Sequence, residues 1–378
     1  MILSETNMNT TLNSHQLINI INNFNTIGEI LQAVPYGDGH INLTYKISTK
    51  HEANVNNYIL QRVNSRVFMK PIELMNNIQQ VTKHLSSLKI KELYPKYEVL
   101  ELVYTKDNQH YFLDTDNEVW RMYVFIEQAI GFSLTDDIDI IQASGEAFGS
   151  FQKMLENFPA FSLNETIKDF HNTPIRFLQL KDALSKNSVN RVQSCQIDID
   201  YALSQEYLSN MITKHLYNGK IPLRVTHNDT KLNNVLIDPV SKEARCVIDL
   251  DTVMPGSLLF DFGDSIRFCV NTASEDEKDL DKVSVDLEKF RAFARGFLHE
   301  TKDVMTTLEK ELLPFAGPIM TLECGIRFLA DYINGDIYFK TTYSTHNLVR
   351  AQNQLKLYKE QMTIIDQIRK IIISLLSD

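Results

Sequence analysis

The sequence predicts an α+β protein of two lobes, in which a small antiparallel sheet comes first and a larger, mainly helical lobe follows. The length favours two lobes, because 378 residues exceed the size at which one hydrophobic core usually stops growing. The order of patterns favours the same division, since strand-like alternation precedes Gly131 and helical periodicity dominates after it. We therefore place an N-terminal lobe at residues 1–127, a hinge at 128–133 and a C-terminal lobe at 134–378.

The first lobe is expected to open with an amphipathic helix, since residues 15–31 repeat apolar side chains at helical spacing. The glycines of PYGDGHINLTYKIST predict a turn before a strand, and NNYILQRVN predicts the next strand. Residues 70–88 predict a helix. Further strands are expected in YEVLELVYTK, HYFLDTD and VWRMYVFIEQ.

The second lobe is expected to be helical except for a β-rich island at residues 223–251. Residues 355–376 predict an amphipathic terminal helix whose apolar stripe either packs in the core or faces a partner or membrane. Core packing is the preferred interpretation, because apolar stripes at helical spacing usually face a protein interior.

Charge and cysteine usage limit the classes of function. A net charge of -10 and a pI near 5.5 oppose the broad basic surface that nucleic acid or an anionic membrane requires. The four cysteines include no CxxC pair, which indicates reduced thiols. We find no signal-peptide pattern and no apolar run of the roughly 18 residues that cross a membrane. We expect a cytoplasmic monomer or homodimer that binds small molecules.

Polar side chains are concentrated in the island, THNDTKLNNVLIDPVSKEARCVIDLDT. Residues 235–237 and 244–248 predict two short strands joined by the turn DPVSK. Asn234 and Asp249 would then lie at the open ends of an antiparallel hairpin, nearly opposite each other. An amide oxygen and a carboxylate are therefore expected to converge beside Asp229.

This set of groups suits phosphoryl transfer, in which a metal bridges phosphate oxygens and a separate carboxylate positions the attacking hydroxyl. Asn234 and Asp249 would hold Mg²⁺, and Asp229 would orient the acceptor hydroxyl and take its proton. Lys231 would neutralise charge on the transferred group. In the alternative interpretation, HNDTKLNN is a capped loop whose polar side chains only satisfy the backbone.

The island resembles the catalytic loop and metal-binding strand of the protein-kinase-like superfamily, in its aminoglycoside phosphotransferase and choline kinase branch. Within that branch the chain is most similar to the bacterial N-acetylhexosamine 1-kinases. The similarity extends over eight blocks: PYGDGHINLTY, YILQRVN, WRMYVFIE, DFHNTPIRF, HNDTKLNNVLID, CVIDLDTVMPG, DFGDSIRF with NTASEDE, and GIRFLADYINGDIYFKTTYSTHNL. The resemblance implies a two-lobed kinase fold and transfer of phosphate from ATP to the anomeric hydroxyl of GlcNAc or GalNAc.

The triplet Asp261, Phe262, Gly263 looks like a protein-kinase metal motif, but it lies too far beyond the catalytic loop and does not end the hairpin strand. We therefore assign the metal to Asp249, with Asp251 as a weaker second candidate. In the family pattern, Asp261 and the later Asp264 support the catalytic loop.

On the nucleotide side, Gly37 and Gly39 would let backbone amides approach phosphate, although a plain hairpin turn explains them too. The second strand run has no lysine to pair with the phosphates. Arg62 is the nearest cation, with Leu60 on its strand face beneath the adenine, and alignment on the family pattern puts Gln61 there instead.

Two further groups complete the expected nucleotide site. Glu73 is a candidate helix partner for the strand cation, or a residue of a solvated helix face. The backbone of Glu127, Gln128 and Ala129 would meet the adenine edge at the hinge.

On the acceptor side, the resemblance puts Arg327 and Tyr338 against the sugar, where their donors and aromatic face suit hydroxyl and N-acetyl groups. Thr252 and Asp264 are further substrate candidates. Asp169 and His171 are candidates as well, with a packed or surface role as the alternative.

Two other functions stay open. A kinase of another hydroxyl acceptor, such as an aminoglycoside, choline or an amino acid alcohol, would use the same catalytic groups. A cationic acceptor would need an acidic pocket, which Arg327 opposes. A nucleotide-binding module without turnover is the remaining alternative, favoured only by the missing strand lysine.

Overall fold

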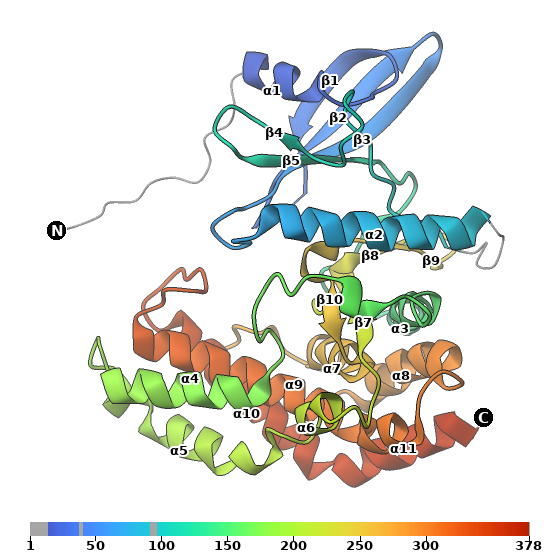
Figure 1. Ribbon diagram of the computed structural model, residues 1–378. Coiled ribbons are helices and arrows are strands. Elements are labelled where there is room, and N and C mark those ends of the chain that lie inside the picture. The colour runs from blue at the N-terminus through green and yellow to red at the C-terminus, as the bar shows by residue number, and fades with distance from the viewer. Residues whose placement is uncertain (1–13, 38–40, 91–96, 378) are drawn as a thin grey trace. The chain divides into compact units, whose positions relative to one another are not determined.

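The computed structural model describes residues 14–37, 41–90 and 97–377 (Figure 1). The chain forms two compact units, one of Met1–Thr82 with Leu100–Glu127 and the other of Lys83–Val99 with Gln128–Asp378. Each unit is described by itself below.

The N-terminal unit is built on a five-stranded sheet of strand order β1-β2-β3-β5-β4, in which every neighbouring pair is antiparallel. The strands are β1 (Glu29–Pro35), β2 (Leu43–His51), β3 (Asn54–Arg62), β4 (Phe112–Leu113) and β5 (Val119–Val124). The predicted small antiparallel sheet is confirmed, and α2 (Pro71–Ile90) confirms the helix predicted at residues 70–88.

The two faces of this sheet differ in character. On β3 and β5, Leu60 lies opposite Met122 and Arg62 opposite Trp120, so these four side chains share one face. Leu60, Met122 and Trp120 are fully buried, and they belong to the core that helix α1 (Ser14–Ile21) completes. The other face carries the intervening residues of both strands.

The leading helix is shorter than predicted. It ends at Ile21 instead of Leu31, and the strand β1 begins at Glu29. Gly28 lies between them with φ of +92°, and a Cβ there would be 2.2 Å from the carbonyl oxygen of Lys50. The glycine thus lets the chain turn closely onto β2, which helical spacing alone did not reveal.

The strand predicted in residues 97–106 was wrong. These residues are extended but form isolated bridges, Leu102 with Tyr123 and Thr105 with Phe24. Val103 donates its N–H to Met122, and Val124 donates to Glu101, so the segment borders β5 without a continuous ladder.

The second unit, in its described residues, contains nine α-helices and two small antiparallel sheets. Its helices are α3 (Ile138–Met154), α4 (Thr173–Lys186), α5 (Gln196–Ser204), α6 (Thr213–Tyr217), α7 (Leu258–Cys269), α8 (Leu287–Thr301), α9 (Thr307–Asn334), α10 (His346–Thr363) and α11 (Ile365–Ser377). Strands β7 (Arg224–Thr226) and β10 (Met254–Gly256) form one antiparallel pair. Strands β6 (Ile130–Gly131), β8 (Val235–Ile237) and β9 (Ala244–Val247) form a three-stranded sheet.

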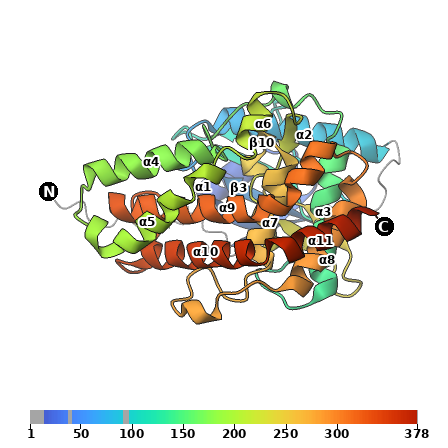
Figure 2. The same ribbon diagram turned by 90° about the horizontal axis from the view of Figure 1, so that it is seen from below.

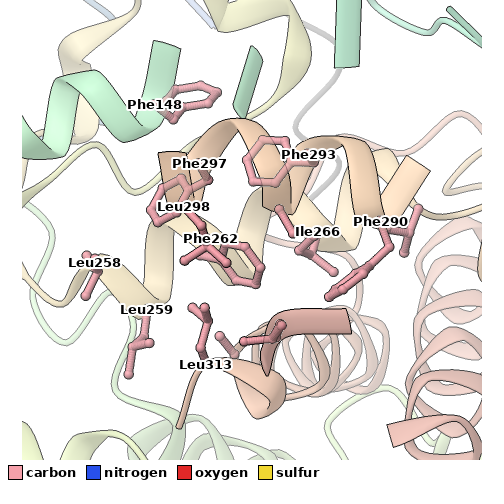
Figure 3. Packing of buried hydrophobic residues seen from close by; sticks show 14 of the residues in the cluster. Phe148, Leu258, Leu259, Phe262, Ile266, Phe290, Phe293, Phe297, Leu298 and Leu313 are labelled. Carbon is pink, nitrogen blue, oxygen red and sulfur yellow. The ribbon is translucent and has the colours of Figure 1, made fainter. Parts of the chain in front are cut away.

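The core of this unit is aromatic. The ring of Phe262 on α7 lies 5.3 to 6.3 Å from the rings of Phe290, Phe293 and Phe297 on α8 (Figure 3). Leu313 of α9 belongs to the same cluster. Helix α7 is therefore fixed between two longer helices, and its polar face is presented to β7.

Helix α9 forms the centre of the remaining packing and lies between α4 and α10 (Figure 2). It is long and apolar enough to cross a membrane by composition, but 89% of its most apolar window is buried inside the protein. That burial is typical of a core helix in a globular protein.

The predicted terminal helix is divided in two, because α10 ends at Thr363 and α11 begins at Ile365. Ile368, Ile371 and Ile372 of α11 are buried in the aromatic core, which confirms the core-packing interpretation. Each of the four cysteines, all of them in the described part of the chain, is a free thiol.

Helices α3 and α8 pack at a glycine crossing. A Cβ on Gly145 would lie 2.3 Å from the carbonyl oxygen of Phe293, and a Cβ on Gly296 would lie 2.2 Å from that of Gln142. Backbone atoms cannot rotate away, so either methyl group would force the two helices apart.

We expect Gly145→Ala to lower the free energy of unfolding by about 1–3 kcal/mol through overpacking, despite the better helix propensity of alanine. Gly325→Ala on α9 is the matched control, since its nearest neighbours are side-chain carbons at 3.3 Å. Urea unfolding of both variants checks this; equal midpoints would show that the crossing tolerates a methyl group.

Candidate active site

The polar loop at residues 227–234 joins β7 to β8 in the second unit. Its first end is fixed by the β7–β10 pair, in which Thr226 lies opposite Met254 and donates its hydroxyl to the Met254 carbonyl. Its second end runs into the β8–β9 hairpin, which confirms the hairpin predicted from the sequence.

The carboxylate of Asp261 holds the start of the loop. It accepts the backbone N–H of His227 at 2.9 Å and that of Asn228 at 2.8 Å, and Gln152 of α3 donates to it as well. Asp261 is fully buried in the first turn of α7. Burial raises the pKa of Asp261, against the opposing effects of His227 and these hydrogen bonds.

Asp264, one turn along α7, holds the middle of the loop. One carboxylate oxygen accepts the backbone N–H of Thr230 at 3.0 Å, and the other accepts from Arg267 at 2.9 Å. Ser265 donates its hydroxyl to the Thr230 carbonyl. Both oxygens of Asp264 thus act within the protein, which favours loop support over the substrate contact considered from the sequence.

Asp229 is oriented by two neighbours in the loop. Lys231 Nζ lies 2.9 Å from Asp229 Oδ1, and the Asn234 amide nitrogen donates to Asp229 Oδ2 at 3.2 Å and to its carbonyl at 2.8 Å. Burial alone would raise the pKa of Asp229, but the charge and hydrogen bond of Lys231 outweigh it and hold that pKa below its ordinary value. Asp229 is therefore an oriented carboxylate anion at neutral pH.

The hairpin brings Asn234 to the end of β9. Val235 lies opposite Val247, and Ile248 donates its N–H to the Asn234 carbonyl at 2.9 Å. Asn234 is thus paired with Ile248, and Asp249 is the next residue along the chain. Asp249 has a left-handed backbone, with φ of 59°. His227 contacts the same place through its Nε2, 2.8 Å from the Ile248 carbonyl.

These residues fit a magnesium site in their donor chemistry. Asn234 uses its amide nitrogen on Asp229, so its oxygen is the atom that suits a hard cation, and Asp249 adds a carboxylate. Among the described residues, no group of three or more His, Cys, Asp or Glu could hold a metal alone. Mg²⁺ is commonly bound by one or two protein ligands together with phosphate and water, so a two-residue site is appropriate.

Thr252 lies beneath the loop. It donates its hydroxyl to the His227 carbonyl at 2.6 Å, and its own carbonyl accepts from the Asn228 side chain at 2.8 Å. Thr252 is buried, and these bonds give it a supporting role in the loop.

A second cluster of candidate residues surrounds Arg327 on α9. Its guanidinium lies 5.2 to 5.9 Å from the centres of the Phe170, Tyr338 and Phe339 rings. Tyr338 is 61% exposed, so its aromatic face is accessible. The two residues that the resemblance assigned to the acceptor are thus neighbours in this unit.

Asp331 positions Tyr338, and sequence reasoning missed it. Its carboxylate accepts the backbone N–H groups of Ile337, Tyr338 and Phe339 at 2.8 to 3.0 Å, and also the amide of Asn347. The helix ends at Gly335 with φ of 98°, so the chain folds back over its last turn. The available signal was Gly335, a helix-ending glycine four residues after Asp331.

His171 connects the two clusters. Its Nδ1 lies 2.9 Å from Glu323 of α9, and its Nε2 lies 3.3 Å from the carbonyl of Asn228 in the polar loop. Burial alone would raise the pKa of Glu323, but His171 and the nearby arginines lower it below its ordinary value. Glu323 and Arg327 are four residues apart on one helix face, so the polar loop and the Arg327 cluster share a support. Asp169 accepts a hydrogen bond from Asn172 instead.

Comparison with known proteins agrees with this geometry. Residues 32–294 match the model of the phosphotransferase enzyme family (APH). The chain belongs to that family.

Solved structures with the same fold include an aminoglycoside phosphotransferase from Alicyclobacillus acidocaldarius, 11% identical, with a TM-score of 0.61 over 94% of this chain and 96% of that chain. A choline kinase from Cryptosporidium parvum Iowa II is 13% identical, with a TM-score of 0.51 over 92% of this chain and 94% of that chain. The predicted kinase-like fold, with a small antiparallel sheet and a helical lobe, is thereby confirmed.

The residues expected on the nucleotide side of this phosphotransferase lie mainly in the N-terminal unit. Gly37 has φ of +77°, whereas Gly39 lies outside the described residues. Arg62 shares a face with Leu60, as expected, but that face is the buried core, and the guanidinium lies 6.0 Å from the Trp120 ring. Leu60 therefore cannot lie beneath an adenine, since it is fully buried there.

The remaining nucleotide candidates have other partners. Gln61 lies on the opposite face of β3 and accepts a hydrogen bond from Arg121. Glu73, in the first turn of α2, pairs at 3.0 Å with Lys70, the residue just before that helix.

The three expected hinge residues straddle the boundary between the two units. Glu127 accepts from Asn57 at 2.7 Å. Gln128 has φ of 56°, and Ala129 is buried just before β6.

We expect Lys231→Met to move the acidic limb of the kcat profile of this phosphotransferase to higher pH, by about 1–2 units. Lys231 keeps the pKa of Asp229 low, so its removal lets Asp229 take up a proton at a higher pH. Lys181→Met, which removes an exposed lysine paired with Glu206, is the control. An acidic limb that stays in place would mean that Lys231 does not tune the base.

Proposed function

We propose that this phosphotransferase uses ATP and Mg²⁺ to phosphorylate the anomeric hydroxyl of an N-acetylhexosamine, GlcNAc or GalNAc, and releases the sugar 1-phosphate and ADP. The observation that carries the proposal is the state of Asp229. It is an anion, oriented by Lys231 and by Asn234, and Asn234 lies beside Asp249 at the open end of the β8–β9 hairpin.

The catalytic role of Asp229 follows from its chemistry. An oriented carboxylate accepts the proton of the acceptor hydroxyl as the oxygen attacks the γ-phosphate. An anomeric hydroxyl loses its proton more readily than an ordinary alcohol, so a carboxylate of low pKa is a sufficient base. Lys231 keeps that carboxylate ionised and offers a positive charge next to the transferring group.

Asn234 and Asp249 would hold Mg²⁺, which when bound neutralises charge on the phosphates. The protein holds these two side chains at the open end of the β8–β9 hairpin. Asp249 is fixed by the hairpin and by His227, whose ring contacts the preceding carbonyl.

The Arg327 cluster supports a neutral, oxygen-rich acceptor. Arg327 supplies N–H donors for hydroxyl or N-acetyl oxygens, and the exposed ring of Tyr338 suits the apolar face of a sugar. Asp331 fixes the Tyr338 backbone, so the ring is presented at a defined place.

The charge of the same cluster disfavours a cationic acceptor such as choline or an aminoglycoside. Arg176 is buried near Arg327, and its pKa is lowered, first by burial and then by the charge of Arg327. Two arginines this close would repel an ammonium group.

We propose the nucleotide-covering lobe at residues 1–127 and the hinge at 128–133, with the backbone of Glu127 to Ala129 meeting the adenine edge. Gly37 would let backbone amides approach the phosphates. Use of ATP together with buried free thiols favours action in the cytoplasm.

The experiment that tests the proposal offers the purified protein ATP, Mg²⁺ and one acceptor at a time. The panel contains GlcNAc, GalNAc, glucose, galactose, choline and an aminoglycoside, and ADP release is followed. We expect turnover with an N-acetylhexosamine and a product whose phosphate is on C1 by ³¹P and ¹H NMR. Faster turnover of choline or the aminoglycoside would mean that the proposed acceptor is wrong. No ADP release with any acceptor would favour a nucleotide-binding module without turnover.

Asp229→Asn should lower kcat by roughly 10²- to 10⁴-fold, because an amide cannot take the hydroxyl proton. The affinity for ATP, measured by calorimetry, should stay close to that of the unmutated protein. Asp366→Asn, at an exposed position on α11, controls for the change of charge. Undiminished turnover would remove Asp229 from the role of base.

A further inference from the structure

The peptide unit between Asn228 and Asp229 lies directly before the proposed base. Asn228 has a left-handed backbone, with φ of 65°, which is uncommon for a residue other than glycine and is kept only where its surroundings hold it. Asp261 accepts its N–H at 2.8 Å, and its side chain donates to the Thr252 carbonyl, also at 2.8 Å. The orientation of the peptide unit that follows then depends on what binds its carbonyl and its N–H.

A histidine contacts each side of that peptide unit. On one side, the Asp229 N–H donates to Nδ1 of His227 at 3.3 Å. On the other side, Nε2 of His171 lies 3.3 Å from the Asn228 carbonyl, and Nε2 is the donor because a carbonyl oxygen only accepts. In the described part of the chain, His171 is the single donor to this carbonyl.

His171 is itself held in place. It lies in the turn before α4, and its ring centre is 4.6 Å from that of Phe170 and 5.3 Å from that of Phe260. Only 8% of its surface is exposed. Its Nδ1 lies 2.9 Å from one carboxylate oxygen of Glu323, whose other oxygen accepts the Thr173 hydroxyl at 2.7 Å. A side chain with so little freedom can position the group that it binds.

The bond to Glu323 connects this ring to the candidate acceptor cluster. Glu323 is buried on α9, four residues before Arg327 on the same helix face. The helix that carries Arg327 and the peptide unit before Asp229 are therefore joined through one imidazole ring. A shift of either one would lengthen one of the two hydrogen bonds that the ring makes.

We propose that His171 is a positioning residue for Asp229, which fixes the peptide unit before the base through the Asn228 carbonyl and holds it in register with α9 through Glu323. In this role His171 acts through Asn228 and does not touch the substrate. The assignment rests on the proposed role of Asp229 as the base.

Two substitutions separate the two bonds of His171. The amide nitrogen of a glutamine reaches the place of the histidine Nε2, so His171→Gln keeps a donor to the Asn228 carbonyl. The amide nitrogen of an asparagine reaches only the place of Nδ1, so His171→Asn keeps a donor to Glu323 and loses the bond to Asn228. Each variant replaces the ring by a carboxamide, so the two are matched controls. His110→Asn, at a histidine that is also 8% exposed and is bound to Asn76, controls for the loss of a buried ring.

The experiment measures turnover of GlcNAc and GalNAc with ATP and Mg²⁺, together with thermal unfolding, for each variant. We expect His171→Asn to lower kcat by roughly 10- to 100-fold with the KM for ATP unchanged, because a displaced base loses its alignment with the acceptor hydroxyl. His171→Gln should recover most of that loss, and His110→Asn should leave kcat unchanged. A merely structural role would lower kcat in step with the melting temperature, whichever nitrogen is kept.

A folded His171→Asn protein with undiminished kcat would overturn the assignment, as would equal losses in the two variants or a larger loss in His171→Gln. If His171→Asn does not fold, ¹⁵N NMR spectra of the unmutated protein decide. A hydrogen on Nε2 of His171 supports the proposal, and an Nε2 without hydrogen overturns it. An unmutated protein that turns over neither sugar contradicts the proposed function instead, and the spectra then still test His171.

Discussion

The carboxylate of Asp261 is the interaction on which the catalytic half of the protein depends. It is fully buried, and it accepts two successive backbone N–H groups, of His227 and Asn228, that the loop cannot satisfy by itself. Its position is fixed in turn by the aromatic packing of Phe262, the next residue, among the rings of α8. Core packing thus fixes the start of the loop. The loop residues that follow Asn228, including Asp229, are positioned from that start.

Helix α9 gives the candidate acceptor cluster its relation to the polar loop. Glu323 contacts His171, which reaches the Asn228 carbonyl, and Arg327 lies one helical turn further on. Asp331, one more turn along, fixes the backbone of Tyr338. Three consecutive turns of one buried helix therefore carry Glu323, which contacts His171, then Arg327, and then Asp331, which binds the Tyr338 backbone. Residues on one rigid helix keep fixed positions relative to one another.

The N-terminal sheet shows how strand register brings together residues that are far apart in the sequence. A strand alternates its side chains between two faces, so neighbours in sequence such as Gln61 and Arg62 have opposite surroundings. Pairing across strands brings Arg121 beside Gln61, although sixty residues separate them.

The sequence by itself determined the division into sheet and helices, the β8–β9 hairpin, the family of the chain and the short segment that contains Asp229, Lys231 and Asn234. These features are local, since periodicity, turn composition and motif spacing act over a few residues. The sequence did not predict the length of the first helix. The chain turns at Gly28, where the backbone packs closely against the Lys50 carbonyl, and such a contact is not visible in helical spacing. The sequence did not reveal the role of Asp331 either.

Only the tertiary structure decided those points. Whether a polar residue supports a loop, orients a ring or faces a ligand depends on partners far away in the sequence, and on which face of an element the core occupies. Asp264 engages Thr230 and Arg267, and Arg62 lies over Trp120, for that reason. Residue type and spacing indicate which chemical groups the chain has, whereas packing and strand register determine where each group lies and what it contacts.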